Sequence, residues 1–512
     1  MAGRYNPANP SKRPGNYVNF RAKTQQRVNA PLQGVAATII THDWGPINET
    51  VEVNSMGDFK AVFGDSTDTQ GYRDVYQLFK GEGGITGRGG AATVLVRRSG
   101  TNSAAKAKKN LTNGTDANAL VLEAVYAGTK GDDLAVGIEA DAVDSSTHHN
   151  IVIFFGGAEV ERFKYAKTDI NAAAVAVNAG SGYVRATANV SGTALTTIST
   201  GSPAGFTTTA GNDGAPLDAG AYTAAMADLG TRRFGVFTVS LDQTANGSIA
   251  TSIKTWAADP NTGLNARGKN FVTVMGGGSI GSPDTLSAAM TRADAFASGA
   301  LGECFVTPGA FRVRDLEIPD PATGDPLELT PATFSPRIAG IICARGYTGA
   351  INFARLADVE IIASLSTDAD FVLAGDQGVT TLSQDSNAIP ARIELGVTCY
   401  QSNTVAKPKE LFSNIKFVRV MHIFETRLND YAESGDVIGR LGVTQETREE
   451  LIGKAKKFLS DLEVEGAINV GQSDAFISTD PPPQSTDNFV SIDYEMEFTR
   501  DLAQLRNNVV VS

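Results

Sequence analysis

The run with most potential for chemistry is Gly276-Gly277-Gly278-Ser279-Ile280-Gly281. It matches the G-x-G-x-x-G pattern, follows a predicted strand at 271–275 and precedes a predicted helix at 283–298, the setting of a dinucleotide site. There, glycines let backbone N–H groups approach a pyrophosphate at a helix N-terminus. However, such turns are common in parallel sheets, and Glu303 in the next strand lies in an apolar run without a clear ribose-binding role. A nucleotide-binding α/β enzyme is therefore kept as an alternative hypothesis.

The other reactive side chains do not form a recognisable site. The three cysteines are far apart in apolar stretches, which favours reduced core residues: Cys304, Cys343 and Cys399. The four histidines do not fall at metal-ligand spacing: His42, His148, His149 and His422. The sequence contains no P-loop, nucleophile elbow or H-E-x-x-H helix. We therefore expect no enzymatic activity, no metal and no cofactor.

The elements around the glycine run alternate between strands and helices. Strands are predicted at 35–40, 92–96, 234–239, 271–275 and 303–306, and helices at 55–63, 72–79, 223–229, 249–257 and 283–298. This alternation predicts a largely parallel sheet. Between the two halves, residues 101–215 are rich in Ala, Thr, Ser, Gly and Asn, with strand-like runs at 119–125, 134–138 and 151–155. That composition favours a β-rich module inserted into the α/β unit.

The last third of the chain has a different pattern. Pro319 to Pro336 is predicted to be a linker, and alternating residues from Ile393 to Cys399 indicate a half-buried strand. Phe417, Met421, Phe424 and Leu428 share one helix face. A second helix after Thr444 has this apolar stripe: Leu451, Ile452, Ala455, Phe458, Leu459 and Leu462. A final alternating strand is predicted at 492–498.

Each end of the chain carries an isolated strand-like run, 16–20 and 509–511. A lone strand has to pair with something distant or with another molecule. The body is acidic, with a net charge of −12, which argues against bulk binding of nucleic acid or anionic membrane. No apolar run approaches the ~20 residues that cross a bilayer, and the N-terminus lacks the apolar centre of a secretory signal. We expect assembly in a cytoplasm, without membrane insertion.

Several short motifs, in order, resemble contractile-tail sheath proteins of phages and phage-like particles. The opening 13–20 resembles the family's arm, and 31–49 resembles its first strand and W-G-P-x-x-E turn. Residues 59–64, 89–97 and 127–136 are similar to the next helix, strand and glycine-containing segment. In the last of these, Asp132 or Asp133 replaces the usual Asn. The helix from Thr444 into 465–468 resembles the family's last helix and its G-A-I exit. The similarity covers roughly residues 12–140 and 335–512.

The resemblance implies a multidomain α/β and α+β fold: a sheath-type core, a β-rich inserted module and extended N- and C-terminal arms. We expect an N-terminal arm at 1–30, α/β core at 31–100 and 216–330, and a variable outward insertion at 101–215. An inner sheath domain would span 335–500, and a C-terminal arm 501–512. The implied function is a structural subunit of the virion tail or contractile particle. It would form stacked hexameric rings around a tail tube and contract after a baseplate trigger.

The expected partners are other copies of the chain, the tube protein, and baseplate and terminator proteins, without direct nucleic-acid contact. The arm strands would pair between subunits through Tyr17, Val18, Phe20, Val509, Val510 and Val511. On the helix after Thr444, three lysines beside the apolar stripe are candidates for facing an acidic tube: Lys454, Lys456 and Lys457. A second alternative is a β-rich surface-binding protein whose insert recognises glycans.

Overall fold

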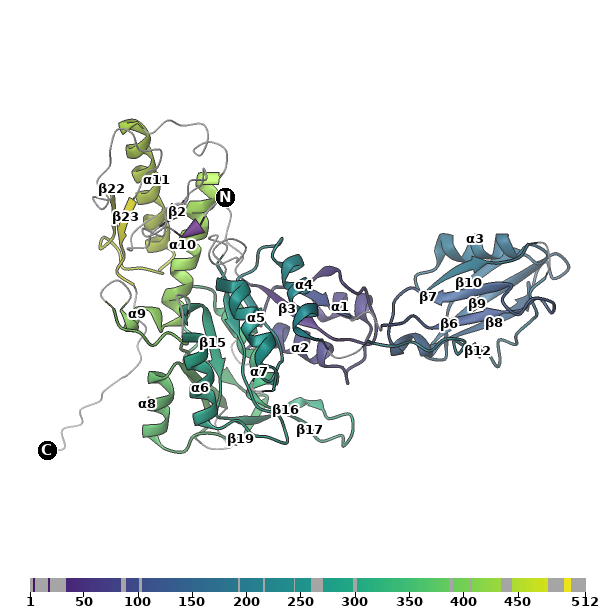
Figure 1. The fold of residues 1–512 in the computed structure, drawn as a ribbon, viewed down its shortest axis with the longest axis horizontal. Coiled ribbons are helices and arrows are strands. Elements are labelled where there is room, and N and C mark those ends of the chain that lie inside the picture. Colours follow the sequence, from purple (N-terminus) through teal and green to yellow (C-terminus); the bar gives the residue numbers. More distant parts are fainter. Residues whose placement is uncertain are drawn as a thin grey trace. The chain divides into compact units, whose positions relative to one another are not determined.

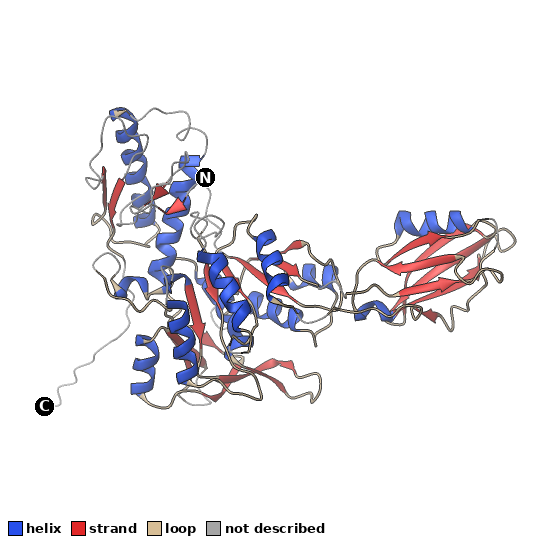
Figure 2. Ribbon diagram, in the orientation of Figure 1, coloured by secondary structure: helices blue, strands red, loops and turns tan. Residues whose placement is uncertain are grey.

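The computed structural model describes residues 3–4, 17–18, 34–83, 89–100, 104–191, 194–214, 217–243, 245–258, 270–297, 302–385, 390–404, 408–433, 444–477 and 492–498. These residues belong to two compact units. Unit 1 comprises Met1–Thr38, Tyr76–Leu95 and Met226–Ser512, and unit 2 comprises Ile39–Val75 and Val96–Ala225. Figure 1 labels the elements along the chain, and Figure 2 separates helices from strands.

The main sheet of unit 1 is largely parallel, as the alternating pattern predicts. Parallel pairing joins β13 (Val236–Thr238), β14 (Val272–Val274), β15 (Phe305–Pro308) and β20 (Val379–Ser383). All residues of these four strands are buried, because helices cover a parallel sheet on both faces. The complete strand order is β18-β21-β20-β15-β14-β13-β3-β5-β4, and the boundary between the units falls inside β3 and β5. The remaining strands are β3 (Val35–Ile40), β4 (Thr50–Val53), β5 (Thr93–Arg98), β18 (Arg355–Leu356) and β21 (Ala391–Leu395).

The helices of this sheet region follow the predicted alternation. They are α2 (Gln70–Lys80), α4 (Ala219–Leu229), α5 (Gly247–Ala258), α6 (Leu286–Ala297), the short η4 (Gly302–Cys304), α7 (Pro331–Arg345) and α8 (Asp368–Asp376). Phe296 of α6 stacks on Phe305 of β15 with ring centroids 4.6 Å apart. Such pairs fix the position of a helix over its strand.

The expected linker at 319–336 is wrong. A three-stranded sheet occupies part of it: β17 (Pro326–Leu329) pairs with β16 (Arg312–Pro319), which also pairs with β19 (Val359–Ala363). Helix α7 then starts at Pro331, because proline suits the first helical position and the Thr330 side chain caps the first turn by accepting from the Thr333 backbone N–H. Pro319, Pro326 and Pro331 lie at the ends of elements, and Pro336 lies inside α7. The prolines therefore belong to a packed region.

The C-terminal part of unit 1 has its own hydrophobic core. Its elements are α9 (Lys409–Phe412), α10 (Ile415–Glu433), α11 (Gln445–Val464), β22 (Asp474–Ile477) and β23 (Ile492–Glu495). Helix α11 follows Thr444 as predicted, and Thr444 caps it by accepting a hydrogen bond from the Thr447 backbone N–H at 3.2 Å. The predicted face of α10 is buried, as are four of the six stripe residues of α11: Ala455, Phe458, Leu459 and Leu462.

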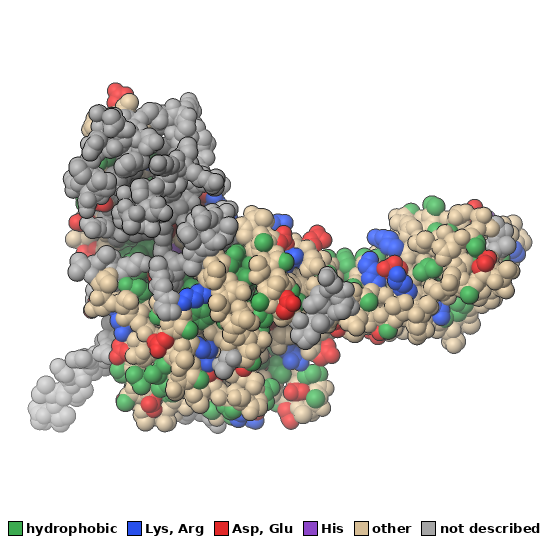
Figure 3. All heavy atoms as spheres, in the orientation of Figure 1, with side chains coloured by type: hydrophobic (Ala, Val, Ile, Leu, Met, Phe, Trp, Pro, Cys, Tyr) green, Lys and Arg blue, Asp and Glu red, His purple; other side chains and the backbone are tan. Residues whose placement is uncertain are grey.

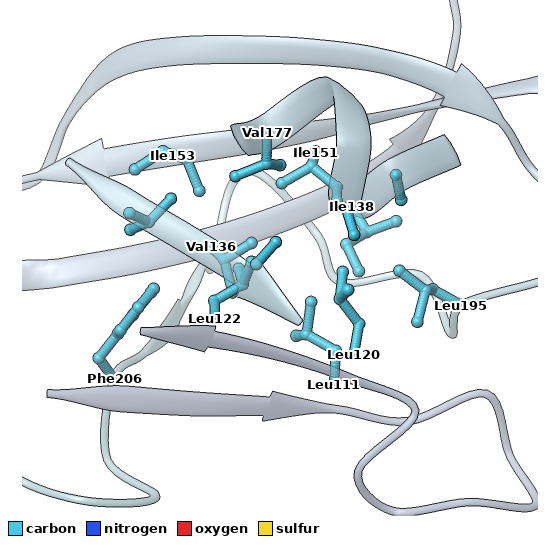
Figure 4. Close-up of a cluster of buried hydrophobic side chains, with 14 of the residues drawn as sticks. Leu111, Leu120, Leu122, Val136, Ile138, Ile151, Ile153, Val177, Leu195 and Phe206 are labelled. Carbon is cyan, nitrogen blue, oxygen red and sulfur yellow. The ribbon is translucent and has the colours of Figure 1, made fainter. Parts of the chain in front are cut away.

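Unit 2 contains a β-rich module between residues 104 and 214. One sheet has the order β10-β9-β8-β12 and the other β11-β7-β6. Their buried side chains, joined by those of α3, form one core, which Figure 4 shows. The elements are β6 (Lys108–Leu111), β7 (Leu120–Ala124), η2 (Thr129–Asp133), β8 (Leu134–Ala140), β9 (His148–Phe155), β10 (Ala158–Ala166), α3 (Ile170–Gly180), β11 (Val184–Ala188) and β12 (Ala204–Gly205). Outside the module, unit 2 also holds α1 (Met56–Phe63).

Candidate assembly surfaces

The glycine run, the first candidate site, is packed against the chain's own side chains. A Cβ atom on Gly276 would lie 2.2 Å from the Pro331 carbonyl oxygen, and one on Gly277 would lie 2.4 Å from Arg292 Cζ. Arg292 Nη1 and Nη2 donate to the two Asp284 carboxylate oxygens at 2.6 and 2.5 Å. Helix α6 starts only at Leu286, so the run does not form its first turn. Close packing accounts for the glycines, and the nucleotide-binding hypothesis gains no support.

The three cysteines are buried and not in disulfide bonds, as predicted. Burial raises the pKa of the Cys343 and Cys399 thiols to about 12, so both stay protonated and unreactive at neutral pH. Cys304 Sγ lies 3.6 Å from His422 Nε2 inside the protein. Among the described residues, no group of three or more His, Cys, Asp or Glu could hold a metal ion. Nor does this part of the chain contain a helix long and apolar enough to cross a membrane.

Only part of the predicted arm strands falls within the described residues. Tyr17 and Val18 form β2 (Tyr17–Val18), which pairs in parallel with β1 (Gly3–Arg4). Phe20 and the terminal Val509, Val510 and Val511 lie outside the described residues. The inter-subunit role of these residues stays a prediction.

Strands β22 and β23 form a two-stranded antiparallel ribbon. Ala475 faces the core of the C-terminal part, and Phe498 joins the same core after β23. A two-stranded ribbon is marginally stable alone and gains from packing or from an added strand. Within the described residues, each ribbon strand pairs only with the other. This ribbon is therefore a candidate acceptor for an added strand.

The three candidate lysines on α11 are not equivalent. Lys454 Nζ lies 5.3 Å from the centroid of the Tyr431 ring, and Lys456 Nζ lies 2.6 Å from Asp474 Oδ1 on β22. Lys457 is exposed, and no ion pair involving it is seen among the described residues. Two of the three lysines therefore help to hold the C-terminal part together, and Lys457 is the strongest candidate for an external contact.

Buried arginines that the sequence did not single out connect α7 to the C-terminal part. The Arg419 guanidinium donates to the Ile342 and Gly346 carbonyl oxygens at the end of α7. Burial lowers the pKa of Arg419 to about 10, so it remains charged at neutral pH. Arg427 donates to the Glu465 carboxylate at 3.0 and 3.1 Å. The positive charge of Arg419 at the C-terminus of α7 is stabilising, and the Arg427–Glu465 ion pair holds α10 to the end of α11.

A second buried network joins α2 to α7 and the β16–β19 pair, all within unit 1. Lys80 Nζ lies 2.5 Å from Asp358 Oδ2 and 2.8 Å from Glu317 Oε2. Arg337 Nη2 donates to Asp358 Oδ1 at 2.7 Å, and Gln77 Nε2 donates to Asp315 Oδ2 at 2.6 Å. Burial alone would raise the pKa of Asp358, but the charges of Arg337 and Lys80 bring it below its usual value. The contacts of Gln77 and Lys80 connect residues more than 200 positions apart.

Arg98 fixes the base of the β-rich module within unit 2. Its Nη1 donates to the Gly45 and Ala127 carbonyl oxygens at 2.6 and 2.7 Å. The entry and exit of the module also pair, since the Ala105 and Asn212 backbones exchange two hydrogen bonds of 2.9 Å. The module therefore joins the rest of unit 2 through two adjacent, hydrogen-bonded segments.

The chain has the fold of sheath tail proteins, which confirms the resemblance. It aligns with the sheath tail protein of Desulfitobacterium hafniense at a TM-score of 0.62 and 17% identity, covering 95% of this chain and 100% of that one. The sheath tail protein of Listeria innocua aligns at a TM-score of 0.62 and 15% identity, and the alignment covers 92% of this chain and 96% of that one. The contracted helical sheath of the anti-feeding prophage aligns at a TM-score of 0.51 and 11% identity, and the alignment covers 98% of this chain and 99% of that one.

Sequence comparison finds more limited matches. No protein-family model matches the chain. Two Bacillus subtilis proteins do: the uncharacterized protein YqbK, 26% identical over 243 residues, and the phage-like element PBSX protein XkdK, 25% identical over 244. The matches cover 47% and 46% of this chain. They cover 48% and 47% of the relatives, so the chain spans about half the length of these proteins.

Proposed function

We propose that this chain is the sheath subunit of a contractile tail or of a phage-like contractile injection particle. The observation that carries the proposal is the fold, which follows solved sheath tail proteins over nearly the whole chain. The protein has a structural role, and its work comes from contacts between copies. In this proposal, copies form hexameric rings stacked around a tail tube, and baseplate and terminator proteins bind at the two ends.

The N- and C-terminal arms would connect the copies. In the proposed lattice, the segment containing Tyr17, Val18 and Phe20, or the run Val509–Val511, adds a strand to the β22–β23 ribbon of a neighbour. Main-chain hydrogen bonds then supply affinity with little dependence on side chains. Because donor and acceptor are different surfaces, the contact is heterologous and propagates into rings or helices.

The rest of the chain would be divided around these arms. Residues 335–500 form the inner part, which faces the tube, with Lys457 of α11 as the main contact residue and Lys454 and Lys456 beside it. The core segments 31–100 and 216–330 form the body, and the insertion 101–215 faces outward. On the face of the molecule in Figure 3, the described surface of the module is mainly neither charged nor hydrophobic, which suits solvent better than a packed interface.

Contraction would need no nucleotide. The extended sheath is then a metastable state that persists because its conversion is slow. A trigger at the baseplate releases it, and subunits move as near-rigid bodies while the strand pairs keep the lattice connected. The buried arginine and lysine networks of unit 1 support this, since breaking a buried ion pair costs roughly 3–5 kcal/mol.

Truncation tests the role of the arms. Removal of residues 1–21, or of the last six residues, should leave a folded, soluble monomer that forms no tubes in negative-stain microscopy. Circular dichroism checks the fold, and the full-length chain is the positive control. Normal tubes from both truncated proteins would show that the copies are joined elsewhere.

A further inference from the structure

Helix α11 has a solvent-facing side that lies opposite its apolar stripe. At 3.6 residues per turn, Gly453 is at the centre of this side and opposite the buried Leu462. Between residues 446 and 460 all residues on this side are exposed, and we call them the α11 outer face: Glu446, Glu449, Glu450, Gly453, Lys456, Lys457 and Ser460. The acidic residues all precede Gly453 and the lysines all follow it. The face is therefore divided into an acidic half and a basic half.

The division of charge is not explained by α11 alone. Glutamate in the first turn suits the helix dipole, but the two lysines stand about two turns before the end, and the last turn has no basic residue. Like charges at i, i+3 and i, i+4 destabilise a helix. Glu446 stands at these spacings to Glu449 and Glu450. The pattern therefore costs stability in a single helix.

The residues four positions before and after the central glycine have few contacts of their own. Glu449 accepts a hydrogen bond from Gln445 on the same helix at 2.9 Å. Lys457 is exposed and makes no ion pair within the described part of the chain. The flanking Glu450 and Lys456 already have partners in the C-terminal part. Glu449 and Lys457 are therefore the residues best placed to meet another molecule.

Gly453 is itself an unfavourable residue for the middle of a helix. A Cβ atom at this position would meet no heavy atom within 4 Å, beyond its chain neighbours and the nearby backbone of its own helix. The packing of the chain therefore does not require a glycine here. A glycine does allow a second helix to approach closely, because the distance between two packed helices depends on the side chains at their crossing.

The charges of the α11 outer face are complementary to those of a second, antiparallel copy. If two α11 helices cross at Gly453, the residue that lies n positions after Gly453 meets the residue n positions before it in the other copy. Glu449 of each copy then faces Lys457 of the other, and Glu450 faces Lys456, so every contact occurs twice. A parallel crossing would instead bring like charges together. Charges that flank a helix contact set its partner and orientation in this way.

We propose that two free subunits pair through their α11 outer faces, antiparallel and crossing at Gly453. The contact is isologous, so it closes at two copies and does not propagate. A single helix pair with a mainly charged surface is smaller than a standard interface, so the pairing is weak and reversible. Pairing concerns the free subunit, and its regulatory meaning rests on the proposed sheath function.

The pair covers the residue that is proposed to contact the tube. A subunit has to separate from its partner before it presents Lys457 to a tube. Subunits at high concentration are thereby held back until a tube is present. A tube with many closely spaced sites then outcompetes the weak pair, since its sites act together on an assembling sheath.

Sedimentation velocity of the full-length protein in low salt tests the pairing, because it separates monomers, dimers and tubes. We expect a dimer with a dissociation constant of roughly 10–100 µM. Glu449→Lys and Lys457→Glu should each raise this constant about tenfold, because each turns two attractive contacts into repulsive ones. High salt should weaken the wild-type dimer by screening these charges. Glu49→Lys is the matched control, because it makes the same charge change at an exposed position of unit 2.

Combinations of the two charge variants make the result specific. An equimolar mixture of Glu449→Lys and Lys457→Glu should form a heterodimer, since each facing pair again has opposite charges. The double variant should pair with itself as wild type does. Gly453→Gln should weaken pairing without unfolding the helix, because glutamine is the better helix former but its side chain fills the crossing point.

Three results would overturn the pairing. The first is a wild-type protein that stays monomeric at roughly 100 µM in low salt, which would leave the face to another partner such as the tube. The second is a mixture that forms no more dimer than the separate variants, and the third is a Gly453→Gln dimer as tight as wild type.

Circular dichroism checks the fold of every variant. If one charge variant unfolds, the other and Gly453→Gln carry the test. Tubes are scored separately by microscopy, so that the two proposals fail independently. A protein that pairs but forms no tubes would contradict only the sheath function, and one that forms tubes but never pairs would contradict only the pairing.

Discussion

At the scale of single residues, Lys457 is the clearest candidate for contact with a tube. Lys454 and Lys456 already contact Tyr431 and Asp474. Changing Lys457 to Glu should spare the fold and self-assembly into sheaths, but weaken co-sedimentation with tail tubes. An exposed ion pair contributes only ~0.2–1 kcal/mol, and repetition along a sheath would multiply it.

The expected defect of Lys457→Glu is greatest in low salt, where charge interactions are least screened. Lys109→Glu, in the β-rich module, is the matched control and should bind tubes as wild type does. If Lys457→Glu binds tubes normally in low salt, α11 does not contact the tube through this residue.

Residue-level prediction succeeded where the information is local and failed where it is not. The cap at Thr444 and the buried cysteines follow from neighbouring residues. The buried arginines do not, because their partners are distant: Arg337 contacts Gln77, 260 positions away. No sequence pattern separates such an arginine from a solvated one. The glycine run was ambiguous for the same reason, since Arg292 and Pro331 account for it only in three dimensions.

At the scale of elements, Lys80 is the connection whose loss should be most costly. Its side chain is 10% exposed and makes ion pairs with Asp315, Glu317 and Asp358. Lys80→Met should lower the free energy of unfolding of unit 1 by roughly 3–5 kcal/mol, because it leaves buried carboxylates with one cation fewer. Urea unfolding followed by circular dichroism measures this. Lys457→Met is the control for an exposed position.

Lys80→Met should also change the pH at which acid unfolds the protein. The pKa of Asp358 is below its ordinary value of 3.8 in the folded protein, so its ionised form stabilises the fold above that pH. This contribution is lost as the pH falls below about 4. Without Lys80, the pKa of Asp358 is lowered less, so the Asp358 contribution to folding is smaller and acid unfolding should begin at a higher pH. An unchanged acid midpoint would mean that Arg337 alone sets the ionisation of Asp358.

Element types were predicted best where hydrophobic periodicity is strong. The parallel strands and the α10 and α11 faces follow from it. The linker at 319–336 was wrong because prolines were interpreted as breaks, whereas Pro331 starts a capped helix. Helix α3 was missed because its Ala- and Val-rich sequence has little polar contrast along its length.

At the scale of the whole molecule, the change of composition after residue 100 indicated a separate β-rich module. The structure describes that module as two sheets around a shared core within unit 2. Contacts between copies could not be predicted in the same way. In the proposed lattice the partner of each arm lies on another copy, and a single sequence does not identify that surface.

Removal of the module tests whether the lattice needs it. The Ala105 and Asn212 backbones already pair, so a short Gly/Ser linker can join the two segments without moving either. Trp44 loses its neighbours Tyr126 and Phe155, whose ring centroids lie 5.4 and 5.6 Å away, and should be changed to Gln to avoid an exposed aromatic. Arg98 keeps its hydrogen bond to Gly45.

We expect the shortened protein to form tubes of normal length, because the surface of the module suits solvent and the proposed arms and ribbon are untouched. Trp44→Gln in the full-length chain is the control for the added substitution, and it should lower stability by roughly 3–5 kcal/mol as a buried aromatic is lost. Circular dichroism must first establish that the shortened chain is folded. The shortened protein and the full-length control both carry Trp44→Gln and differ only in the module. A folded shortened protein that forms no tubes would then show that the module takes part in the lattice.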